Sequence, residues 1–543
     1  MLSMRATFSG AILFGALTLQ ASAAQSAPSP NQNSAQPSNQ SSTSNVSTLH
    51  VTSRLVFLDV TVLDARGYPV VKGLTKDDFA ITQDKKPQKI FSFEAPDAHL
   101  ASGSTTEDNP TGEAPVDIFV IDELNSSFEQ MAYIRYCVHQ YLAKEPSKLS
   151  APAEVMLLGN ESLEMVQGYT RNKQELLSAV DHLPAAIPFK DNPSFFSERF
   201  VQSINGLRQI ALENTGIPGR KNIIWIGHGG PSLYTTFLDR KTAEEITTYV
   251  HKTANLLVDA RMSLFLIYPG LEAATSRTFT PQSAIAAETE IGDNDPFSGD
   301  VNFGVFVNET GGQLFYNRND LDQLIRSSVE LGSHYYTLTY QPPESIANGK
   351  FLRVRVAMRD PALQALTKAG YFSADKGQPT DPRLDTLYNI AEAVQTNVPF
   401  AGLEVTLQKI VRHSDTNSAE FTVHVNMKDA DWKPEANGSS GVDIGFAGAS
   451  LSSRRYVLAS KTEAFTMSNA SQDPNHLEKL QATLTMTLRI PRNTKSVRFV
   501  VGSLVGGRIG SVDVERKMID TAPDLPTPEP KLIPQPAKRP PTQ

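Results

Sequence analysis

The chain has 543 residues and a single cysteine, Cys137, so it cannot form a disulfide within itself. It also lacks an excess of positive charge, because 50 Lys and Arg residues stand against 58 Asp and Glu residues. The resulting net charge of −8 argues against nucleic acid as the main partner, which usually needs a basic face. No stretch approaches about 20 consecutive apolar residues, so we expect no membrane-spanning segment.

Motifs that mark several classes of enzyme are missing as well. The sequence contains no Gly-x-Ser-x-Gly nucleophile elbow, no Walker-type phosphate loop, no His-Glu-x-x-His zinc motif and no pair of cysteines. The segment His228-Gly229-Gly230-Pro231 is similar to the oxyanion-hole segment of some hydrolases, but an esterase would also need the missing elbow. We therefore expect a protein that is not an enzyme.

The two ends of the chain have compositions that do not suit a packed core. Residues 1–24 are typical of a secretory signal peptide, with Arg5 before a short apolar stretch and small residues at 21–24. Residues 25–48 are rich in Ser, Gln, Asn and Pro and predict a disordered linker, and residues 521–543 predict a proline-rich tail. The signal peptide predicts a secreted protein, located in the periplasm or outside the cell.

Between these ends, length and composition predict several domains. Residues 49–96 alternate apolar and polar side chains and predict a small β module, or an N-terminal extension of the next domain. Residues 115–373 alternate strand and helix patterns, which predicts an α/β domain with a doubly wound, mainly parallel sheet. Residues 385–520 show short strand patterns separated by turns, which are typical of a C-terminal antiparallel β-sandwich.

One candidate site follows the apolar run from Val116 to Ile121, which predicts a strand buried on both faces. Asp122 stands at the carboxyl end of this strand, followed by Asn125, Ser126 and Ser127. Ligands of open α/β sheets bind outside the carboxyl ends of the strands, so a carboxylate and small oxygen-bearing side chains there suggest a cation site. Alternatively, the three residues after Leu124 only cap the next helix.

Five segments, in this order, give the sequence a more specific character: VDIFVIDELNSS, PGRKNIIWIGHGGPS, TGGQLFYNRNDLDQLI, HYYTLTYQPP and KFLRVRVAMRD. Together they resemble the bacterial VWFA-related family of the acidobacterial type, over residues 50–373. The resemblance implies a von Willebrand factor A (VWA) fold, which is Rossmann-like, and it implies binding rather than catalysis. In the wider VWA family, a metal-ion-dependent adhesion site lies on top of the sheet.

The resemblance assigns metal ligands to this chain only in part. Of the pattern Asp-x-Ser-x-Ser, Asp122 matches the first Asp and Ser126 the second Ser, while Leu124 replaces the first Ser. The segment Gly227-His228-Gly229 stands where the family has an Asp-Gly pair. The resemblance thus implies a degenerate site, with Asp122 and Ser126 as ligands of Mg²⁺ or another divalent cation.

The middle loop of the family supplies a threonine ligand, for which Ser194 or Ser197 would substitute here. The function that the resemblance implies is a secreted module that binds a protein or a component of the cell envelope. The alternative is a structural or scaffolding protein of the envelope that works without a metal ion.

Overall fold

The structure is a computed structural model. It describes residues 55–99, 115–183, 195–234, 238–269, 295–298, 300–316, 318–343, 348–373, 382–434, 439–469 and 480–526. The predicted signal peptide, the predicted linker, most of the long loop after Tyr268 and most of the proline-rich tail lie outside these residues.

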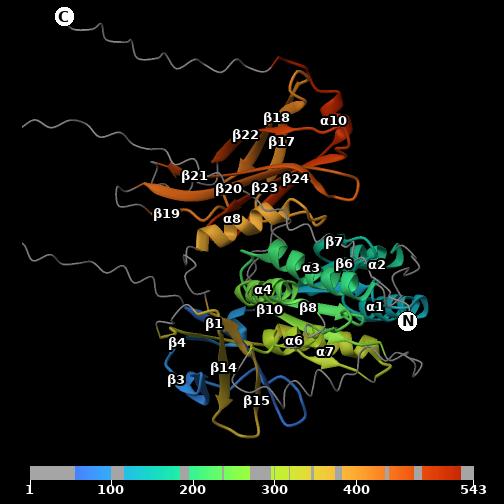
Figure 1. Cartoon of the computed structure of the whole chain (residues 1–543). Coiled ribbons are helices and arrows are strands. Elements are labelled where there is room, and N and C mark those ends of the chain that lie inside the picture. The colour runs from blue at the N-terminus through green and yellow to red at the C-terminus, as the bar shows by residue number, and fades with distance from the viewer. Residues whose placement is uncertain are drawn as a thin grey trace, which may run out of the picture. The chain divides into compact units, whose positions relative to one another are not determined.

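A six-stranded sheet forms the centre of the α/β region (Figure 1). Its strands, in spatial order, are β12 (Leu314–Phe315), β10 (Met262–Ile267), β8 (Lys221–Ile226), β5 (Val116–Asp122), β6 (Lys148–Leu158) and β7 (Leu163–Asn172). Neighbouring strands are parallel except for β6 and β7. The predicted mixed α/β fold with a mainly parallel sheet is therefore confirmed.

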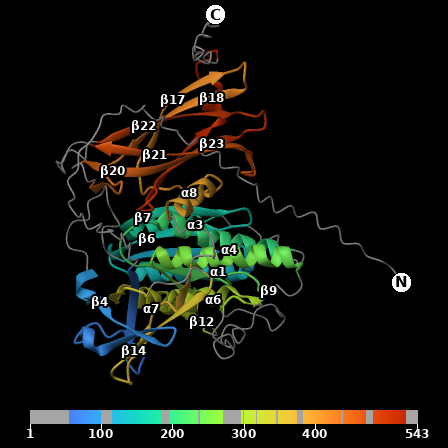
Figure 2. The same ribbon diagram turned by 60° about the vertical axis from the view of Figure 1, so that its left-hand side comes forward.

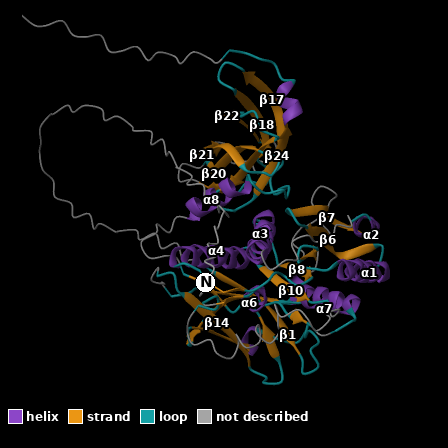
Figure 3. Cartoon of the chain, turned by 45° about the vertical axis from the view of Figure 1, so that its right-hand side comes forward, coloured by secondary structure: helices purple, strands orange, loops and turns teal. Residues whose placement is uncertain are grey.

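Helices cover both faces of this sheet because side chains of alternate residues point to opposite sides of a strand. On β5, Ile118 and Val120 pack on one face, and Phe119 and Ile121 on the other. The first face is covered by α3 (Phe196–Asn214), α4 (Arg240–Asp259) and α6 (Phe303–Thr310). The second is covered by α1 (Phe128–Lys144), α2 (Lys173–Asp181) and α7 (Leu321–Ser333). Figure 3 shows α4 and α7 on opposite sides of β8 and β10.

No helix within the described ranges is long and apolar enough to cross a bilayer.

The N-terminal strands do not form a sheet of their own. They are β1 (Val56–Leu63), β2 (Phe79–Gln83), β3 (Lys86–Gln88) and β4 (Ile90–Glu94), with the short helices η1 (Lys76–Asp78) and η2 (Pro96–His99). Their partners come from the far end of the α/β region: β13 (Tyr336–Tyr340), β14 (Phe351–Met358) and β15 (Gln364–Leu366). A further strand, β16 (Gly370–Phe372), pairs with β14. The two sheets have the orders β15-β1-β13-β4 and β16-β14-β2-β3.

The boundary expected between residues 49–96 and 115–373 therefore does not separate two structures. The alternating pattern of β1 shows which face is buried, but it carries no information about which strand pairs with it. Of the two alternatives at this segment, the strand pairing favours an extension of the α/β domain. A two-stranded ribbon of β9 (Leu233–Tyr234) and β11 (Asp300–Val301) completes this part of the chain.

Two antiparallel sheets follow in the C-terminal region. One contains β17 (Val405–His413), β18 (Ser418–Asn426) and β22 (Gln481–Arg489). The other contains β19 (Lys433–Pro434), β20 (Ser440–Leu451), β21 (Val457–Asn469), β23 (Ser496–Ser503) and β24 (Ile509–Glu515). Side chains from both sheets share one hydrophobic cluster, and the short helix α10 (Arg516–Asp520) contributes Ile519 to it.

A helix that the sequence analysis did not predict, α8 (Pro382–Ala393), precedes these sheets and packs on β20 and β23 (Figure 2). Leu387 and Ile390 of α8 join the same hydrophobic cluster as Leu212 of α3. Nearby, Arg208 Nε donates to Glu392 Oε2 at 2.9 Å. The helix therefore contacts both the α/β region and the C-terminal sheets.

Candidate functional site

The strand order of the central sheet places a topological switch point between β5 and β8. The chain passes from β5 to β6 and β7 on one side, and then returns to β8 on the other side of β5. Asp122 ends β5, and Gly227 and His228 directly follow β8. Ligands of doubly wound sheets bind at such a point. The structure thus brings together the two segments that the sequence analysis compared with the VWA metal site.

The carboxylate of Asp122 is enclosed by hydrogen-bond donors. Its Oδ1 accepts from the backbone N of Asn125 at 3.1 Å and from the amide Nδ2 of that residue at 2.9 Å. Its Oδ2 accepts from Trp225 Nε1 at 3.0 Å, from Gly229 N at 2.8 Å and from Asn125 Nδ2 at 3.1 Å. Asp122 thereby links the loop after β5 to the loop after β8.

Burial dominates the electrostatics of this carboxylate, whose side chain is 0% exposed. Burial raises the pKa of Asp122 above its ordinary value, while the hydrogen bonds from Trp225 and Gly229 act in the opposite direction. A buried carboxylate is tolerated only where its oxygens are hydrogen-bonded, and the donors around Asp122 meet that need.

Asn125 connects Asp122 to the neighbouring elements. Its Nδ2 also donates to Ser203 Oγ at 3.0 Å, and its Oδ1 accepts from Arg199 Nε at 3.0 Å. Its backbone carbonyl accepts from Nδ1 of His228 at 2.5 Å, and the His228 ring packs edge-on against Tyr268. The cluster therefore spans β5, α3 and the loop after β8.

The three residues considered as helix caps have different roles. Ser127 caps α1: its Oγ accepts from Gln130 N at 3.2 Å, and Gln130 Oε1 accepts from Ser127 N at 2.8 Å. Asn125 instead binds Asp122, as described above. Ser126 is buried, and its Oγ makes no hydrogen bond with the described residues. The capping interpretation is therefore correct for Ser127 alone.

The remaining positions of the family pattern lie elsewhere. Leu124, at the position compared with the first Ser, is buried in the hydrophobic cluster on the face of the sheet that α3 covers. Ser197 is exposed on the first turn of α3, and Ser194 lies outside the described residues. Ser203, which the sequence analysis did not consider, is the α3 hydroxyl that reaches the cluster.

These contacts test whether the residues fit a divalent cation, which takes oxygen ligands in near-octahedral geometry. Both oxygens of Asp122 are directed at N–H donors, and the Arg199 side chain is hydrogen-bonded to Asn125. Within the described part of the chain, no group of three or more His, Cys, Asp and Glu side chains is arranged to hold a metal ion. The surroundings of Asp122 therefore do not fit such a cation. The assignment of Asp122 and Ser126 as metal ligands stays a prediction, and a titration with a divalent cation tests it.

Sequence reasoning missed several members of the cluster, although two signals were present. Trp225 stands alone among aliphatic residues in a buried strand, and a buried indole N–H usually finds an acceptor. Arg199 and Ser203 are four residues apart, so they share one face of α3. Neither signal identifies Asp122 or Asn125 as the partner, because that depends on the packing of α3 over the sheet.

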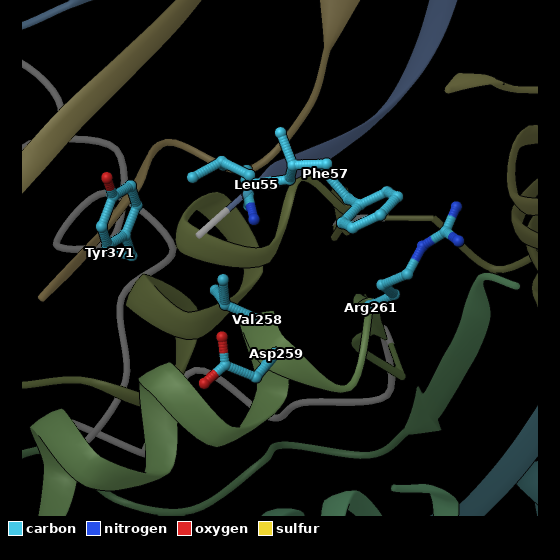
Figure 4. A pocket seen from close by; sticks show the side chains of 8 residues that line it. Leu55, Phe57, Val258, Asp259, Arg261 and Tyr371 are labelled. Carbon is cyan, nitrogen blue, oxygen red and sulfur yellow. The ribbon is translucent and has the colours of Figure 1, made fainter. Parts of the chain in front are cut away.

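A separate cavity of about 200 Å³ lies away from this cluster (Figure 4). It is lined by Leu55, Val56, Phe57, Val258, Asp259, Arg261, Lys368 and Tyr371. Arg261 directly precedes β10, so the cavity lies at the amino ends of the parallel strands, opposite the end that bears Asp122. Arg261 Nε donates to Asp59 Oδ2 at 3.0 Å. None of the predicted site residues lines this cavity.

A buried carboxyl group on α6 makes the stability of the fold depend on pH. Glu309 is 6% exposed, and its Oε2 has no hydrogen-bond partner among the described residues. Burial raises its pKa to about 8, while Arg353 acts in the opposite direction. Because the folded state holds this proton more tightly than the unfolded state, its stabilising contribution is complete below pH 4.5 and is lost as the pH rises through about 8.

We therefore predict that Glu309→Gln raises the free energy of unfolding in alkaline solution. Near pH 9 the variant should exceed the wild type by about 2–4 kcal/mol, and near pH 5 the two should agree within about 1 kcal/mol. Chemical denaturation at the two pH values measures this difference. Glu164→Gln, at an exposed position of β7, is the matched control. A gain of the same size at both pH values would contradict the prediction.

Comparison with known proteins adds the following findings. No protein-family model matches the chain, and no curated protein matches it. Among solved structures that match is the VWA domain of SpRpn10, with 14% sequence identity and a TM-score of 0.20. That alignment covers 40% of this chain and 96% of the SpRpn10 domain. The strand order of the central sheet follows from the strand pairing in this chain and not from this comparison.

Proposed function

We propose that this chain is a secreted binding protein of VWA type, which holds a protein or a component of the cell envelope at the switch-point end of its sheet. The observation that supports this is the hydrogen-bonded cluster of Asp122, Asn125, Arg199, Ser203 and His228 at that end. The N-terminal β extension and a C-terminal β-sandwich would flank this binding domain.

Exposed groups next to the cluster supply a surface for a partner. Phe128, the first residue of α1, is 52% exposed, and Ser127 and Glu129 beside it are exposed as well. Aromatic side chains, including Phe, are enriched at protein interfaces, so we take Phe128 as the side chain that a partner would bury. We call Ser127, Phe128, Glu129 and His228 the top face.

The contacts of Asp122 favour a top face that works without a metal ion. In adhesion-type VWA domains the cation joins the domain to a partner carboxylate, and the domain must offer it free oxygen ligands. Here N–H groups of Trp225, Gly229 and Asn125 already satisfy the carboxylate. These donors would hold the two loops in place as a cation does elsewhere.

The proposal is tested by capture of envelope components on the immobilised full chain. Phe128→Ala should weaken capture about 10–100-fold, because truncation of a central aromatic side chain removes much of the binding energy. Tyr136→Ala is the matched control, since Tyr136 lies two turns along the same helix and is 61% exposed. Equal loss with both variants, or with neither, would contradict a partner site at the top face.

Metal dependence is measured on the same protein. We predict that capture in Mg²⁺ or Mn²⁺ equals capture in EDTA, and that calorimetric titration with either cation shows no heat of binding. If capture fails in EDTA and Asp122→Ala abolishes the heat of binding, the degenerate metal site is functional and the metal-independent form of the proposal is wrong.

A further inference from the structure

The longest strand of the C-terminal region, β21, lies at an edge of its sheet. It pairs with β20 over twelve residue pairs, from Ser440 opposite Asn469 to Leu451 opposite Val457, and the two strands run side by side in Figure 1. Among the residues that the structure describes, β20 is the only strand that pairs with it. An edge strand of this length presents a row of backbone groups to any extended chain.

The charges of β21 are arranged so that they do not repel an antiparallel copy. Lys461 and Glu463 flank Thr462 at the middle of the strand, with 2.6 Å between Lys461 Nζ and Glu463 Oε1. Lysine at a sheet edge commonly blocks edge-to-edge pairing, because its charge would lose contact with water between the paired strands. In antiparallel pairing centred on Thr462, however, each Lys461 faces Glu463 of the other copy.

Residues further from the centre also match under this two-fold arrangement. The small side chain of Ala459 falls opposite the large one of Phe465. Opposite charges and matched apolar side chains across two strands each stabilise a sheet, whereas like charges destabilise it. In parallel, in-register pairing, Lys461 would face Lys461, so the charges also select the direction of the strands.

We propose that two copies of this chain associate through their β21 strands, which run antiparallel with Thr462 on the two-fold axis. The two sheets that contain β20 and β21 then continue as one sheet across the dimer. The resulting arrangement is isologous, as in most closed dimers, because the same strand serves on both sides. This proposal does not depend on the top face, which lies in a different domain.

A charge exchange on the full chain tests the proposal. Lys461→Glu places four carboxylates at the centre of the interface, and Glu463→Lys places four ammonium groups there. Each single variant should raise the dimer dissociation constant at least about tenfold, and the double variant Lys461→Glu/Glu463→Lys should restore it. Both side chains are partly exposed, and circular dichroism shows whether each variant folds. Analytical ultracentrifugation over a wide range of concentration measures the dissociation constant.

Cysteine substitution tests the register. Thr462→Cys places the two thiols opposite each other, so oxidation should give a covalent dimer, whereas Ser468→Cys near the end of the strand should not. A wild type that stays monomeric at every concentration overturns the proposal. A dimer that survives both single charge variants, or that the double variant fails to restore, also overturns it.

Discussion

Replacement of Asp122 by alanine is expected to lower the free energy of unfolding by about 3–5 kcal/mol. The change leaves the N–H groups of Trp225, Gly229 and Asn125 buried without an acceptor. Each such group costs about 1–3 kcal/mol, although removal of the buried carboxyl recovers part of its own desolvation. Thermal and chemical unfolding, followed by circular dichroism in EDTA, measure the loss.

Asp77→Ala is the control for this prediction, because Asp77 is exposed on η1 and should change stability by less than about 0.5 kcal/mol. The measurement also separates the two roles considered for Asp122. A metal ligand would matter for stability only when the cation is bound. If Asp122→Ala is as stable as the wild type in EDTA but loses a stabilisation by Mg²⁺, the hydrogen-bonding role is wrong.

Gly227→Ala should be more damaging, with a loss of at least about 3 kcal/mol and poor recovery of folded protein. Gly227 has φ +149°, and a Cβ on it would lie 2.4 Å from Cβ of Asp122. The Asp122 side chain cannot move aside, because its donors hold it from both loops. For the same reason Gly227→Asp, which adds a carboxyl group at this position, should unfold the site rather than create a metal ligand.

Gly67→Ala separates the cost of the steric clash from the cost of backbone strain. Gly67 also has a positive φ, +84°, but a Cβ there would have no atom within 4 Å. The free energy of unfolding of Gly67→Ala should therefore fall only by the cost of backbone strain, about 1 kcal/mol. Chemical denaturation measures both losses of stability. Similar values for Gly67→Ala and Gly227→Ala would show that the Asp122 side chain shifts to accommodate the new Cβ.

The fold could be predicted largely because its signals are local. The apolar run of β5 and the amphipathic pattern of α1 each indicate one element, and their alternation indicates the layers. Partner choice is not local, so the pairing of β1 with β13 was not predicted. The helix α8 was missed since the burial of Leu387 and Ile390 depends on contacts with a distant region of the chain.

At the candidate site, the sequence located the end of β5 but not its chemistry. Asp122 was correctly placed at the carboxyl end of a buried strand. A carboxylate there suits a cation or a ring of N–H donors equally well, and the pattern of residue types does not distinguish them. The distinction comes from the orientation of the Asn125 amide and from the Trp225 indole, which tertiary packing sets.

The pairing of the first strands with the last strands of the α/β region sets an order of assembly. Thr61 donates to the carbonyl of Leu331 across 270 residues, and Ser92 bonds Thr339 across 247. Contacts so far apart form late, because the long loop between them must close first. During synthesis β1 and β4 therefore stay unpaired until β13 has been made. The strands of the central parallel sheet lie between β4 and β13 in the sequence, so they are available to fold earlier. Strands that wait unpaired are exposed to aggregation, so we expect the nascent chain to need protection until β15, which ends at Leu366, has emerged.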